Sequence, residues 1–132
     1  YVLIMQHDRA FVRSVDVEQL VWLMEEHERV KYLGMPTATT LHHQYHVLSK
    51  YGIRVAAEEV APGLTITPLI QWYDSAHLAR TDYYRNFVFG SKHLVARGGF
   101  IEDKLGQKQL HDIRTLGLEA HKEFGTYILN DS

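Results

Sequence analysis

The sequence has no cysteine among its 132 residues. Disulfide frameworks, zinc–thiolate sites and thiol catalysis are therefore excluded. Charge of one sign is not in excess, since 14 Lys and Arg residues stand against 16 Asp and Glu residues. Without a basic field, the sequence gives no sign of a nucleic-acid partner. No apolar run approaches the roughly 18 residues of a membrane span, and no signal peptide is visible.

The residues that are present fit one globular domain spanning 1–132. Hydrophobic residues make up 45% of the chain, which is enough for a substantial core. The chain opens at Tyr1 on the continuous apolar run 1–5, which is typical of a strand covered on both faces. Because domains rarely open on a central strand, we expect this domain to be a piece of a longer catalytic domain.

Apolar spacing predicts an α/β chain. A strand over 1–5, a helix over 16–28 and a strand over 30–35 form a βαβ-sized unit, which favours parallel pairing. Asp16 is the expected N-cap of that helix. The remaining predicted elements are helices over 41–51, 76–80, 82–89 and 102–119, a hairpin with arms 53–60 and 64–72, and a strand over 125–129.

Two acidic sites carry the chemistry that the sequence suggests. Asp8 follows the first predicted strand, and open α/β sheets bind ligands beyond the carboxyl ends of their strands. Glu102 and Asp103 open a predicted helix directly after Gly98 and Gly99, and glycines let a backbone turn tightly near a ligand. A carboxylate at the first site could hold a divalent cation, and one at the second could act as a general base.

These two motifs resemble those of GT-A-type glycosyltransferases of the family-2-like group. The run Gln6-His7-Asp8 after an apolar strand resembles the family's Asp-x-Asp region, with Gln6 in place of the first aspartate. The run from Gly98 to Asp103 resembles its glycine-led x-Glu-Asp motif. The resemblance implies a partial GT-A-like mixed sheet with flanking helices, covering the acceptor-side half of the fold.

The resemblance also implies an activity, which is inverting, metal-assisted transfer of a sugar from a nucleotide-sugar donor to a hydroxyl acceptor (a glycan, lipid or protein). Asp8 would bind Mn²⁺ or Mg²⁺ on the donor diphosphate, with His121 as a further ligand and His111 as the second choice. Asp103 would be the base, and Glu102 would either contact the acceptor or support the loop.

Aromatic and polar residues after the predicted arm 64–72 suggest a place for the sugar. In a glycosyltransferase, Trp72 or Tyr73 could stack on a sugar face while Asp74 and His77 bond its hydroxyls. Without the nucleotide-binding half, we expect weak or no turnover by these 132 residues alone.

Two other functions compete with this interpretation. A non-catalytic α/β binding module would hold Asp8 and Asp103 far apart or in structural pairs. A metal-dependent hydrolase would bring His42 or His46 within metal-ligand distance of Asp8.

Overall fold

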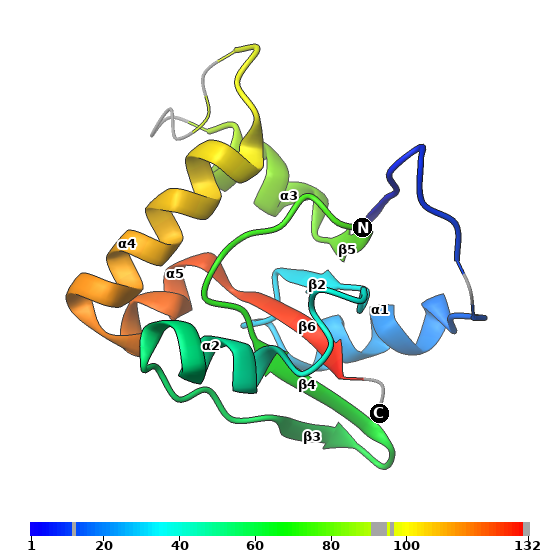
Figure 1. Ribbon diagram of the computed structural model, residues 1–132. Coiled ribbons are helices and arrows are strands. Elements are labelled where there is room, and N and C mark those ends of the chain that lie inside the picture. Colours follow the sequence, from blue (N-terminus) through cyan, green and yellow to red (C-terminus); the bar gives the residue numbers. More distant parts are fainter. Residues whose placement is uncertain (12, 91–94, 96, 131–132) are drawn as a thin grey trace.

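The computed structural model describes residues 1–11, 13–90, 95 and 97–130. A mixed sheet of six strands lies at its centre, in the order β1-β5-β2-β6-β4-β3 (Figure 1). Its strands are β1 (Val2–Ile4), β2 (Tyr32–Gly34), β3 (Glu58–Ala61), β4 (Leu64–Pro68), β5 (His77–Ala79) and β6 (Thr126–Asn130). The predicted mixed α/β class is therefore confirmed, while a specific GT-A arrangement stays a prediction.

Strand β5 determines the directions within the sheet. It pairs antiparallel with both β1 and β2, so β1 and β2 run the same way without touching. Strand β2 pairs parallel with β6, which makes β1, β2 and β6 co-directional. The carboxyl ends of these three strands therefore lie at one end of the sheet, together with the amino end of β5.

Helix α1 (Val17–Glu26) covers one face of the sheet. Its apolar side buries Leu20, Leu23 and Met24 against the strands, as its i, i+3, i+4 spacing predicts. The side chain of Asp16 accepts a hydrogen bond from the Gln19 amide at 3.1 Å, which confirms the predicted N-cap.

The other described helices cover the opposite face and the adjoining edge (Figure 1). The main cluster on that face includes Tyr32, Trp72, Leu105 and Phe124, all fully buried. These helices are α2 (His43–Tyr51), α3 (Thr81–Tyr83), the π-helical turns η1 (Tyr84–Val88) and η2 (Glu102–Gly106), α4 (Gln107–Leu116), the 3₁₀ turn η3 (Leu118–Ala120) and α5 (His121–Phe124).

Some predicted elements differ from those observed. The predicted helix over 76–80 is wrong, because residues 77–79 form β5, which is buried between two strands. The predicted helix over 102–119 starts as predicted but ends at Leu116, where Gly117 takes a φ of +90°. The hairpin is confirmed with shorter arms, and Gly52 ends α2 as predicted.

Gly106 lets the helix that begins with η2 lie directly against the chain at Trp72. A Cβ atom at Gly106 would come within 2.7 Å of the Trp72 carbonyl oxygen. We therefore expect Gly106→Ala to lower the free energy of unfolding by about 1–3 kcal/mol through overpacking. Urea unfolding measures this change, with Gln107→Ala at the next, exposed position as the control. Equal stability of the two variants would contradict the close packing.

Candidate functional site

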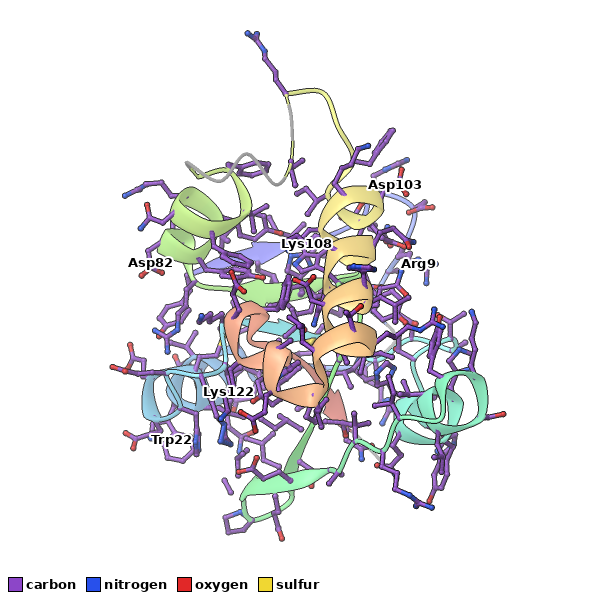
Figure 2. The ribbon with its side chains drawn as sticks, turned by 90° about the vertical axis from the view of Figure 1, so that its left-hand side faces the viewer. Arg9, Trp22, Asp82, Asp103, Lys108 and Lys122 are labelled. Atoms are coloured by element: carbon purple, nitrogen blue, oxygen red, sulfur yellow. The ribbon has the colours of Figure 1, made fainter. Side chains whose placement is uncertain are left out.

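The sheet register and one hydrogen bond relate both predicted acidic sites to segment 73–76. His77, the first residue of β5, pairs with both Ile4 and Gly34. The residues that follow β1, Asp8 among them, therefore leave the sheet at the end where the segment 73–76 enters it. Glu102 meets that segment through a hydrogen bond. Figure 2 labels Asp103 at the upper end of the long helix that η2 and α4 form.

Segment 73–76 is held by four hydrogen bonds, which come from β2, η2, β5 and the residue that follows β2. Such tethering fixes the position of the side chains that the segment carries. The four bonds join the Tyr73 carbonyl to the Tyr32 hydroxyl (2.7 Å), the Asp74 amide to Glu102 Oε2 (2.7 Å), the Ser75 carbonyl to His77 Nδ1 (2.5 Å), and the Ala76 carbonyl to the Met35 amide (2.8 Å).

Buried His77 and half-buried Tyr84 form a hydrogen-bonded pair beneath this segment. The ring of His77 is fully buried and stacks on Tyr32, with ring centroids 4.2 Å apart. Its Nδ1 donates to the Ser75 carbonyl, so Nε2 accepts from the Tyr84 hydroxyl at 2.5 Å. Burial lowers the pKa of His77 to about 4, so the ring is neutral at pH 7. No sequence signal links residues seven positions apart in this way, so the sequence did not predict the role of Tyr84.

Two carboxylates stand at the surface of this region. Asp74 is exposed, and partial burial raises the pKa of its carboxyl above the usual value. Asp103 is also exposed, while its neighbour Glu102 is half-buried and bonded to the Asp74 amide. Of the two roles suggested for Glu102, support of the loop is the one for which a contact is observed. The described residues offer no hydrogen bond or ion pair to the carboxylate of Asp103.

A cleft of about 780 Å³ lies next to Asp8 on the α1 side of the same sheet end. Met5 and Arg9, on either side of Asp8, line it, and so does Ala76 from the tethered segment. Arg13 adds a second guanidinium to its wall. Its volume is in the range of small-molecule sites. The cleft thus borders the segments that carry Asp8 and Asp74, although neither carboxylate is among its lining residues.

Two predicted site residues are not placed for the roles expected of them. Trp72 is fully buried against Tyr32 and His77, so it offers no ring face to a sugar. His121 donates from Nε2 to the Thr126 carbonyl at 2.6 Å, at the amino end of β6 and hence at the opposite end of the sheet from Asp8. Figure 2 shows the neighbouring Lys122 far below Asp103. A shared metal site for Asp8 and His121 does not fit this placement.

The remaining predicted residues are at the surface or half-buried. Tyr73 is half-buried, with its ring edge-on to His43 at 6.3 Å. Gly98 and Gly99 are exposed, and the φ of +80° at Gly98 favours glycine. No described atom lies within 4 Å of a Cβ placed on Gly98, so this residue shapes the turn before η2.

The structure also bears on the two alternative functions, the metal-dependent hydrolase and the non-catalytic binding module. The described residues contain no group of three or more His, Asp or Glu side chains that could hold a metal, and thus no such group of Asp8 with His42 and His46. Asp8 and Asp103 are exposed, and the described residues offer no structural pair for either.

Comparison with known proteins identifies no relative: no family model, curated protein or solved structure matches the chain. Within the described residues, none of the helices is both long enough and apolar enough to cross a membrane.

The hydrogen bond between Glu102 and the Asp74 amide can be tested directly. We expect Glu102→Ala to speed hydrogen exchange of the Asp74 amide about tenfold, because a bond to a charged acceptor is lost. Glu102→Gln keeps an acceptor oxygen and should have a smaller effect. Exchange measured by NMR in Asp103→Ala is the control, and an unchanged rate in Glu102→Ala would contradict the tether.

Three buried histidines, His43, His77 and His121, should make the fold sensitive to acid, because burial lowers the pKa of each. Burial lowers the pKa of both His43 and His77 to about 4, below the ordinary 6.5. The unfolded chain therefore binds more protons, and stability falls as pH drops from 6.5 towards 4, by about 1.4 kcal/mol per pH unit for each of these two histidines. Urea unfolding at pH 6, 5 and 4.5 measures this slope. His43→Leu should reduce the slope of unfolding free energy against pH by the contribution of one histidine. His111→Gln, at an exposed position, should leave the slope unchanged.

Proposed function

We propose that this chain is the acceptor-side part of a GT-A-like glycosyltransferase. It would take part in transferring a sugar from a nucleotide-sugar to a hydroxyl acceptor with inversion at the anomeric carbon. Two observations support the proposal: Glu102 is bonded to the Asp74 amide, and His77, which follows segment 73–76, pairs with Ile4 at the end of the strand that precedes Asp8.

The cleft beside Asp8 supports a donor site there. Arg9 and Arg13 contribute two guanidinium groups to its wall, and guanidinium groups bind phosphate oxygens with good geometry. The mixed apolar and polar lining also suits a nucleotide. In this proposal the diphosphate lies near Asp8. Ala76, from segment 73–76, would lie between the diphosphate and Asp74 of the same segment.

The donor set around Asp8 fits a cation that is shared with the substrate. Asp8 is a single exposed carboxylate, and no group of three metal-binding side chains exists among the described residues. Mg²⁺ is commonly held by one or two carboxylates together with substrate phosphates. Asp8 would hold such a cation, which when bound neutralises charge on the leaving diphosphate. His121 has no part in this site.

Asp103 would act on the acceptor side as the general base. Its exposed carboxylate would take the proton from the acceptor hydroxyl as that oxygen bonds to the anomeric carbon. The bond from the anomeric carbon to the diphosphate oxygen breaks in the same step, and the nucleoside diphosphate leaves. Glu102 would position Asp103 by fixing the start of the helix against Asp74. Asp74 would bind a substrate hydroxyl.

Calorimetric titration with UDP and Mn²⁺ tests the donor site. We expect wild-type protein to bind UDP in a Mn²⁺-dependent way, and Asp8→Ala to weaken that binding by at least about tenfold. Glu28→Ala, an exposed carboxylate near the opposite end of β2, serves as the matched control and should bind normally. Metal-dependent binding that survives Asp8→Ala unchanged, or no binding by the wild type, would contradict the proposal.

A further inference from the structure

An exposed aromatic ring lies at the start of the helix that carries the proposed base. Phe100 is 73% exposed and belongs to none of the described core clusters, whereas the next residue, Ile101, packs into the core. Trp72 and Tyr73, the aromatic residues first considered for a sugar, are buried and half-buried. Phe100 therefore offers the more accessible ring beside Glu102 and Asp103.

Helical geometry sets Phe100 and Asp103 on one face. The Lys104 amide donates to the Phe100 carbonyl at 3.2 Å, so the first helical turn already includes Phe100. Residues three and four positions apart on a helix are neighbours on its surface. Asp103 and Lys104 are thus the exposed charged residues of the turn that Phe100 begins. Asp103 occupies the exposed upper end of this helix in Figure 2.

From this arrangement we infer that the acceptor is a carbohydrate, with one pyranose ring lying on Phe100 and a hydroxyl of that ring reaching Asp103. The inference rests on the proposed function. A pyranose presents axial C–H groups on one face and hydroxyls around its rim. An aromatic ring favours the C–H face, and a carboxylate accepts strong hydrogen bonds from the hydroxyls.

The surroundings of Phe100 favour a sugar over other acceptors. A single exposed ring on a turn that also carries a carboxylate and an ammonium matches a ligand with one small apolar face and a polar rim. An extended lipid chain requires a longer apolar surface, which the charged neighbours Glu102, Asp103 and Lys104 interrupt. Asp74, fixed by Glu102, adds a second carboxylate for hydroxyls near the same turn.

Saturation-transfer NMR with the intact chain tests this inference. The probes are methyl β-glucoside, methyl β-galactoside, lactose and cellobiose, with octyl phosphate and a serine peptide as the other acceptor classes. We expect saturation of pyranose ring protons in at least one sugar, and a loss of about three- to tenfold in Phe100→Ala. Phe100→Trp keeps an aromatic face and should retain the signal.

Phe89→Ala is the matched control. Phe89 is 57% exposed, but its turn carries Arg85 and Asn86 in place of carboxylates, and its ring leans on Tyr84 at 5.9 Å. This variant should keep the sugar signal. No saturation of any of the four sugars, an equal signal in Phe100→Ala, or selective binding of octyl phosphate or the peptide would overturn the inference.

The two proposals fail separately. If UDP binding depends on Asp8 but the sugars do not contact Phe100, the transferase proposal stands and the carbohydrate acceptor is lost. If the sugars contact Phe100 but UDP does not bind, the transferase is lost and Phe100 marks a carbohydrate-binding site. Because Phe100 is exposed, its replacement leaves the core intact, and near-UV circular dichroism verifies this.

Discussion

Antiparallel pairing of β5 with both β1 and β2 determines which loops of this chain meet. A short strand in that direction returns the chain to the end of the sheet where its parallel neighbours finish. The segment before His77 therefore lies beside the residues that follow Ile4 and Gly34. Without β5, the residues after β1 and the start of the helix at Glu102 would have no common neighbour.

The rigidity of segment 73–76 follows from how its backbone groups are satisfied. A turn at a sheet end would ordinarily be bonded to water, but here four hydrogen bonds with protein groups take that place. The neutral state of His77 matters to this arrangement, because Nδ1 must donate while Nε2 accepts from Tyr84. The result is a surface carboxylate, Asp74, on a segment that is fixed from beneath.

Features that depend only on residues close together in the sequence could be predicted from it. The Asp16 cap and the glycine at 52 are determined by neighbouring residues and could be predicted. Strand β5 could not, because three residues carry no period and their state is set by two distant strands. The burial of Trp72 and the distance of His121 from Asp8 likewise depend on tertiary packing. The sequence suggested two acidic sites. The contact between Glu102 and Asp74 joins residues 28 positions apart, so no pattern of neighbouring residues could predict it.

The central claim of the proposed function is that a metal–diphosphate bound at Asp8 lies close to Asp103, the proposed base, across segment 73–76. Paramagnetic broadening of amide NMR signals by Mn²⁺ in the presence of UDP measures this most directly. The account predicts broadening at 5–9, 74–76 and 102–103, with signals at 27–31 and 121–126 left sharp because they lie at the other end. Broadening at 121–126, or sharp signals at 102–103 while 5–9 broaden, would contradict it.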